Sequence, residues 1–203
     1  MIILTKREEK FLCALTTPEK IQDYLDSIPF NHEEHGETCR SAYGVIQHKK
    51  AHCLEGAFFA CAALLYQKKT PYILSLKVTQ EDNDHVITLY KEHGYWGAIS
   101  KTNHVVLGFR DPVYKSIREL VMSYFHEYFL LKNGKKTLHG YSNPINLKRF
   151  GTSWIDSPED QFPIAYTIAE GYHRPIIPKE IKLPIRKATP FERKVVSISR
   201  DGK

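Results

Sequence analysis

The sequence AHCLEGAFFACAALLYQ, residues 51–67, is the stretch on which the interpretation of the whole chain depends. Its small and apolar side chains recur at helical spacing, so one helix face is almost entirely apolar and the helix is predicted to be mostly buried. Cys53 lies in the first turn, where the helix dipole and unpaired backbone N–H groups favour an anion such as a thiolate. Cys53 is therefore the candidate nucleophile. Cys61, in the middle of the apolar face, is predicted to be a buried and unreactive thiol.

The strands predicted after this helix supply a candidate base. Residues 72–78 alternate apolar and polar side chains, which predicts a half-buried strand. The run HVITLY, residues 85–90, predicts a second strand that begins with a histidine, His85. The turn sequence EHG then leads to a third predicted strand at residues 95–100. A cysteine nucleophile needs a base, and His85 is the histidine that this hairpin offers.

This order of residues resembles the transglutaminase-like branch of the papain-like cysteine enzymes. The likeness rests on Cys53 in AHCLEGA, on His85 in DNDHVITLY and on YWGAISKTN, and it covers roughly the middle third of the chain. A longer stretch of the chain, from RDPVYKSIRELVMSYFHEYF to GKKTLHGYSNP, resembles a group of uncharacterised bacterial proteins with the same core. The resemblance implies an α+β fold with helices packed on an antiparallel sheet. It also implies a thiol that attacks an amide or peptide carbonyl and forms a thioester, as in a protease, an amidase or a transglutaminase.

Ser100 is the point at which the chain departs from the family pattern. In that pattern an aspartate usually follows the tryptophan of the third strand, at the position that Ser100 occupies here, four residues after Trp96. The third group orients the imidazole and stabilises its cation, which a carboxylate does better than an amide or a hydroxyl. Asn103 is the alternative, because an asparagine fills this role in papain-like proteases. The predicted catalytic set is Cys53 and His85 with either Ser100 or Asn103. The competing hypothesis is a catalytically inactive binding module with the same fold.

Two groups are candidates for stabilising the oxyanion of an acyl-transfer reaction. Gln47 precedes Cys53 by six residues, the spacing at which papain-like proteases carry an oxyanion-hole glutamine. The backbone N–H of Cys53 is the second candidate, because the first amides of a helix have no partner within that helix. His52 is interpreted as a rim histidine that points away from the thiol, and Glu55 as a first-turn acid that suits the helix dipole.

The composition of the 203 residues is typical of a soluble globular protein, with 42% hydrophobic and 12% aromatic residues. No apolar run approaches the ~18–20 residues of a membrane helix. The N-terminal sequence MIILTKREEK carries charges where a signal peptide has its apolar core, so a cytoplasmic protein with no membrane partner is expected. The net charge of +6 is spread over short doublets rather than one basic face, and a nucleic-acid partner is not expected.

Cysteine and histidine spacing gives no sign of a metal or a disulfide framework. The four cysteines, which include Cys13 and Cys39, contain no CxxC pair, so reduced thiols are expected. The histidines lack the close pairs that tetrahedral zinc sites use. We expect no metal and no cofactor, and a protein or peptide substrate as the partner.

The segments around this core are predicted from capping and turn residues. One domain is expected over residues 1–172, with a helical lead-in at 1–40 and a core at about 41–110. The expected elements before the core helix are a helix at residues 6–15, a second helix capped by Thr17, a polar loop at 31–40 that borders a cleft, and a short helix capped by Ser41.

Beyond the hairpin the sequence predicts further elements and a C-terminal arm. The expected elements are a strand at residues 104–109, a helix capped by Asp111 and Pro112, a tight hairpin centred on Asn133 and Gly134, and a helix at about 159–172. Residues 173–203 mix prolines with lysines and arginines, which predicts an extended or partly disordered basic arm. Binding of RNA or an acidic partner through this arm is a third hypothesis.

Overall fold

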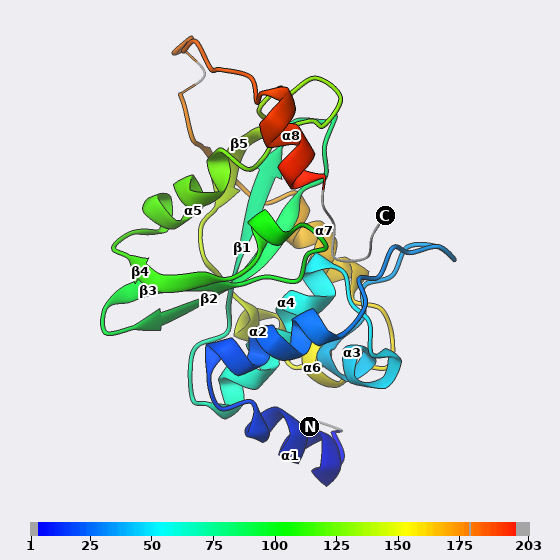
Figure 1. The fold of residues 1–203 in the computed structure, drawn as a ribbon. Helices are drawn as coiled ribbons and strands as arrows, with labels where there is room; N and C mark the ends of the chain where they lie inside the picture. Colours follow the sequence, from blue (N-terminus) through cyan, green and yellow to red (C-terminus); the bar gives the residue numbers. More distant parts are fainter. Residues whose placement is uncertain (1–3, 179, 198–203) are drawn as a thin grey trace.

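The computed structural model describes residues 4–178 and 180–197, and it shows helices packed on an antiparallel sheet, as expected for the α+β class (Figure 1). The helices are α1 (Lys6–Ala14), α2 (Pro18–Ser27), α3 (Ala42–His48), α4 (Cys53–Tyr66), α5 (Ile117–Phe125), α6 (Ser153–Asp156), α7 (Phe162–Ala169) and α8 (Pro190–Val196). The strands are β1 (Tyr72–Val78), β2 (His85–Glu92), β3 (Tyr95–Ile99), β4 (Arg110–Tyr114), β5 (Leu138–Ser142), β6 (Ile145–Asn146) and β7 (His173–Pro175). Within these described residues, no helix is both long and apolar enough to cross a membrane.

The sheet has the strand order β4-β3-β2-β1-β5-β7, and β6 pairs with β1. Thr88 of β2 lies opposite Ile99 of β3, so the register places Ser100 opposite Ile87, two residues from His85 on the same face. The hairpin predicted from the alternating pattern is confirmed, and it brings the beginning of β2 close to the residue that follows β3.

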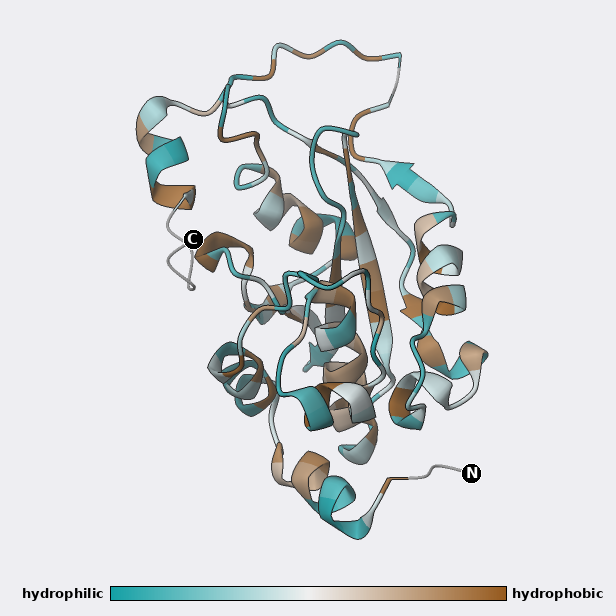
Figure 2. Ribbon diagram, turned by 90° about the vertical axis from the view of Figure 1, so that its right-hand side faces the viewer, coloured by the Kyte–Doolittle hydropathy of each residue, from teal (hydrophilic) through white to brown (hydrophobic). Residues whose placement is uncertain are grey.

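Helix α4 is enclosed by the rest of the fold. It contacts β1 and β2 on one side and α1, α2, α3 and α6 on the others. Every residue from Leu54 to Leu64 is buried, including Cys61, as the apolar pattern predicted. Hydrophobic residues gather where the helices meet the two faces of the sheet, whereas the connecting loops are largely hydrophilic (Figure 2). The whole length of α4 is therefore packed against neighbouring elements, and this packing fixes the position of its first turn.

The helices predicted ahead of the core are confirmed. Thr17 caps α2 and Ser41 caps α3, each by accepting a hydrogen bond from a backbone N–H of the first turn. A tight turn is also present at Gly134, whose N–H donates to Leu130 O, next to an antiparallel bridge between Phe129 and Lys136.

The predictions for residues 104–114 are wrong. The expected strand at 104–109 is a loop with a single 3-10 turn, and Asp111 and Pro112 lie in β4 instead of capping a helix. β4 is an edge strand, where a proline removes no ladder hydrogen bond from the interior of the sheet. Helix α5 begins later because Ser116 and Glu119 form a capping box.

The C-terminal segment is more ordered than the sequence suggested. Pro163 occupies the first turn of α7, which starts at Phe162 rather than at residue 159. The prediction of an extended or partly disordered arm from residue 173 is wrong for α8, a helix that Thr189 caps, whereas β7 is an extended segment that pairs with β5. Residue 179 and residues 198–203 of the predicted arm lie outside the described residues.

Candidate active site

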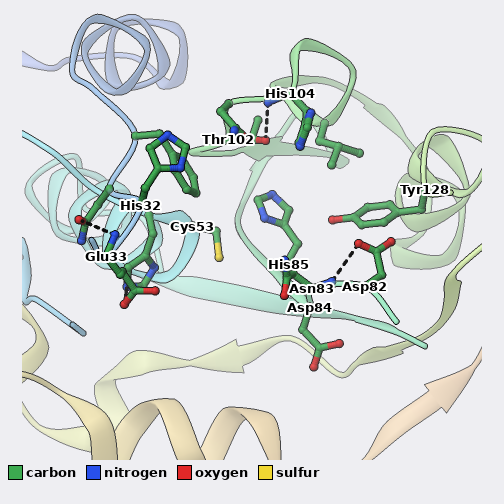
Figure 3. Close-up of a pocket in the computed structure, with 15 residues that line it drawn as sticks. His32, Glu33, Cys53, Asp82, Asn83, Asp84, His85, Thr102, His104 and Tyr128 are labelled. Atoms are coloured by element: carbon green, nitrogen blue, oxygen red, sulfur yellow. Dashed lines mark hydrogen bonds and ion pairs between the residues drawn. The ribbon is translucent and has the colours of Figure 1, made fainter. Parts of the chain in front are cut away.

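Cys53 and His85 line the same pocket, which has a volume of about 480 Å³ (Figure 3). Cys53 enters from the start of α4 and His85 from the start of β2, while Tyr128 points into the pocket from another wall. The prediction that the loop after α2 borders a cleft is confirmed by the three residues of that loop that line the pocket, namely Asn31, His32 and Glu33. The pocket thus joins the helix start and the hairpin that the sequence predicted to meet.

His85 is oriented by Ser100. The His85 Nε2 lies 2.8 Å from the Ser100 Oγ, and both side chains are buried. The Ser100 hydroxyl donates its only proton to Leu107 O at 2.8 Å. It must therefore accept the hydrogen bond from His85, which places the ring proton on Nε2 and leaves Nδ1 as the basic nitrogen.

Asn103 is the alternative third group. It lines the pocket, but no hydrogen bond within the described part of the chain joins it to His85. Of the two residues that the sequence left open, Ser100 is the one at the ring.

The electrostatic surroundings of Cys53 favour its thiolate. The side chain is half-buried, and burial raises the pKa of a thiol. The nearby His52 and His85 imidazoles outweigh burial and lower the pKa of Cys53 to about 5. Two other cysteines show the opposite behaviour, since burial raises the pKa of the Cys39 thiol to about 12 and also raises that of Cys61. Cys53 thus combines a low pKa with access to a pocket.

His52 is the N-cap of α4, and the prediction of a rim histidine that points away from the site is wrong. Its Nδ1 accepts a hydrogen bond from the Leu54 N–H at 3.2 Å, and its Nε2 lies 2.9 Å from Thr38 O. Burial lowers the pKa of the His52 ring, but the Cys53 thiolate, the Glu55 carboxylate and the Thr38 carbonyl outweigh it and raise that pKa to about 9. Both nitrogens of His52 are engaged by the backbone, whereas His85 keeps Nδ1 for proton transfer. His52 therefore holds the helix start in place, and His85 is the candidate base.

The prediction that Gln47 serves the oxyanion hole is wrong. Gln47 is exposed in the last turn of α3, and its Nε2 donates to Glu8 Oε1 of α1 at 2.6 Å. The reach of this side chain toward α1 takes the amide out of the pocket. The backbone N–H of Cys53 is the remaining candidate, because no hydrogen bond found within residues 4–178 and 180–197 uses it as a donor.

Glu55 is a buried carboxylate with more contacts than the first-turn acid that the sequence predicted. Its side chain has no exposed surface, and its two oxygens accept hydrogen bonds from five groups: Asn31 Nδ2, Thr38 Oγ1, the Arg40 N–H, Arg40 Nη1 and the His52 N–H. Burial raises the pKa of a carboxyl, but the neighbouring His52 charge and these hydrogen bonds outweigh it and lower the Glu55 pKa. Glu55 ties the loop that borders the pocket to the first turn of α4. A glutamate three residues after a helix cap was the signal for this role.

Comparisons with models of known protein families and with curated proteins found no match to this sequence. Within the part of the chain that the structure describes, no group of three or more His, Cys, Asp or Glu side chains could hold a metal ion. The pocket presents a thiol, an imidazole whose Nε2 is bonded to Ser100, and the first backbone amides of α4.

Proposed function

We propose that the protein is a cysteine-dependent acyl-transfer enzyme that acts on an amide or peptide bond. The observation that carries the proposal is the Cys53 thiol with a lowered pKa, in one pocket with an imidazole whose tautomer is fixed by Ser100. A thiolate next to an oriented base is the arrangement that forms a thioester from a carbonyl substrate. A protein or peptide substrate and a reducing compartment such as the cytoplasm, where the thiol stays reduced, fit this chemistry.

The reaction would proceed in two steps. The Cys53 sulfur attacks the carbonyl carbon, and the Cys53 backbone N–H donates to the oxyanion that forms. The protonated His85 then gives its Nδ1 proton to the leaving nitrogen, the C–N bond breaks and a thioester remains. In the second step water or an amine attacks the thioester carbonyl, His85 takes a proton from it, and the Cys53 thiolate leaves.

The arrangement of elements supports a transglutaminase-like core for this enzyme. A cysteine begins a helix that packs against the sheet, a histidine lies on β2, and the third group follows β3. This is the order that the family resemblance implied. Ser100 replaces the expected aspartate, and a hydroxyl stabilises the imidazolium less than a carboxylate does.

The first test is the pH dependence of Cys53 alkylation by iodoacetamide. Because the pKa of this thiol is lowered, the thiolate forms above about pH 5 and the rate should have its midpoint there. An ordinary thiol has its midpoint near ~8.5. Cys13 is exposed, so the measurement uses a Cys13→Ser background, mass spectrometry to locate the adduct, and Cys53→Ser as the blank. A midpoint near 8.5 would rule out the enzyme.

A non-catalytic binding module is the second candidate, and the hydroxyl of Ser100 at the position of a carboxylate is the observation that favours it. Thioester formation separates the two. An enzyme should release ammonia from N-blocked glutaminyl peptides or new amino termini from a peptide library, and hydroxylamine should trap the acyl group as a hydroxamate. A binding module would bind such peptides and leave Cys53 unmodified.

A further inference from the structure

The backbone of Ser100 is held by a side chain instead of a neighbouring strand. Ser100 lies just beyond the last residue of β3, where the strand ladder has ended. Gln22 of α2 takes over both ladder positions: its Oε1 accepts from the Ser100 N–H at 2.9 Å, and its Nε2 donates to the Ser100 O at 2.9 Å. The amide of Gln22 therefore acts on Ser100 as the peptide group of another strand would.

The Gln22 amide has only one orientation that satisfies its partners. Its Nε2 also donates to Asp26 Oδ1 at 2.8 Å, and the residue is only 5% exposed. A flipped amide would set its NH₂ group against the Ser100 N–H and its oxygen against two acceptors. The Gln22 side chain is thus a fixed support for the backbone of Ser100.

The residue after Ser100 is anchored to the same helix. Lys101 is buried, and its Nζ donates to Leu25 O at 2.8 Å and to Ile28 O at 2.6 Å at the end of α2. Gly56 of α4 also packs against Lys101, and an added Cβ there would come within 2.3 Å of Lys101 Cβ. Residues 100 and 101 are therefore fixed between α2 and the helix that carries Cys53.

From this geometry we infer that Gln22 is a positioning residue for the base, and this inference rests on the proposed function. Gln22 fixes the backbone of Ser100, the Ser100 Oγ accepts from His85 Nε2–H, and His85 Nδ1 is left to exchange a proton with the thiol. Gln22 itself touches neither substrate nor thiol. Helix α2, which the sequence analysis placed in a lead-in outside the core, is on this view a part of the catalytic apparatus.

The test compares Gln22→Met with wild-type protein in the alkylation assay. Methionine keeps the volume of glutamine but removes both hydrogen bonds to Ser100. The midpoint of Cys53 alkylation should rise by about one pH unit, the shift that one lost hydrogen bond of ordinary strength would produce. Nitrogen-15 NMR, recorded at a pH where the His85 ring is neutral, should show a single Nε2–H tautomer in the wild type and a mixture of tautomers in the variant.

Gln67→Met is the matched control, because the Gln67 side chain joins α4 to Leu15 O, away from Ser100. It should lower stability without moving the alkylation midpoint or the His85 tautomer. An unchanged midpoint and tautomer in Gln22→Met, with a low midpoint in the wild type, would overturn the role of Gln22 and leave the proposed function standing. A high midpoint in the wild type would overturn the proposed function itself.

If Gln22→Met does not fold, Gln22→Leu decides the question. Leucine is uncharged, fits within the space of the glutamine side chain and offers Ser100 neither a donor nor an acceptor. The same rise of the midpoint and the same mixture of His85 tautomers are expected, and their absence would overturn the inference.

Discussion

Replacing His85 by alanine is expected to raise the midpoint of Cys53 alkylation by at least about two pH units, toward the ~8.5 of a free thiol. The His85 imidazole is one of the groups that lower the Cys53 pKa, and alanine cannot replace it. His52 also lowers this pKa and remains in the variant, so the shift need not be complete. The variant should therefore lose the reactivity at pH 5–7 that depends on a preformed thiolate.

The same substitution should make the fully ionised thiol faster. A thiolate of higher pKa is the stronger nucleophile, and a rise of about two units corresponds to roughly a tenfold higher plateau rate with iodoacetamide at high pH. Amide turnover should fall by about 10²–10⁴-fold, because the leaving nitrogen loses its proton donor. A higher midpoint pH together with a higher plateau rate distinguishes loss of the base from simple damage to the site.

His104→Ala is the matched control for His85→Ala. His104 lines the same pocket, but its backbone makes its hydrogen bonds, to Thr102 Oγ1 and from the Leu107 N–H. Its removal should leave both the midpoint and the plateau rate unchanged. If His85→Ala keeps the midpoint near that of the wild type, the low pKa of Cys53 comes from His52 and the helix N-terminus, and His85 is not the base.

The parts of the site that follow from local sequence pattern were predictable. The 3.6-residue period placed Cys53 at a buried helix start, and the alternation of residues 85–90 placed His85 at the beginning of a strand. Ser100 was one of two alternatives, because its position after the third strand corresponds to that of the family aspartate. Only the strand register could choose between Ser100 and Asn103, and a single sequence does not specify side-chain contacts at that level.

The remaining parts depend on contacts between distant segments. Gln22 meets Ser100 across 78 residues of sequence, and no periodicity indicates that an α2 side chain will complete a strand. His52 was misread because histidine is not among the usual N-cap residues. Two other predictions followed from local sequence and were wrong because of distant contacts. Gln47 has the spacing of an oxyanion-hole residue but bonds to Glu8 of α1, and Pro112 is a common helix-start residue but lies in the edge strand β4.

Glu55→Gln is expected to lower the free energy of unfolding by about 3–5 kcal/mol, the range found when one partner of a buried, hydrogen-bonded charge is removed. One carboxylate oxygen faces the His52 N–H and Asn31 Nδ2, and the other faces the Arg40 N–H and the Thr38 hydroxyl. An amide has one oxygen, so its NH₂ group meets donors in either orientation, and buried donors are left unsatisfied.

The pH dependence of this loss tests the charge itself. The Glu55 pKa is lowered in the folded state, so its contribution is present above the ordinary value of 4.5 and disappears as the pH falls through the folded pKa. Urea unfolding of wild type and variant should therefore differ most near pH 7 and converge in acid. Glu119→Gln is the control, because Glu119 occupies the same capping-box position in α5 but is exposed, and it should cost less than ~1 kcal/mol. If Glu55→Gln costs no more than Glu119→Gln, the loop beside the pocket is held to α4 by contacts other than this carboxylate.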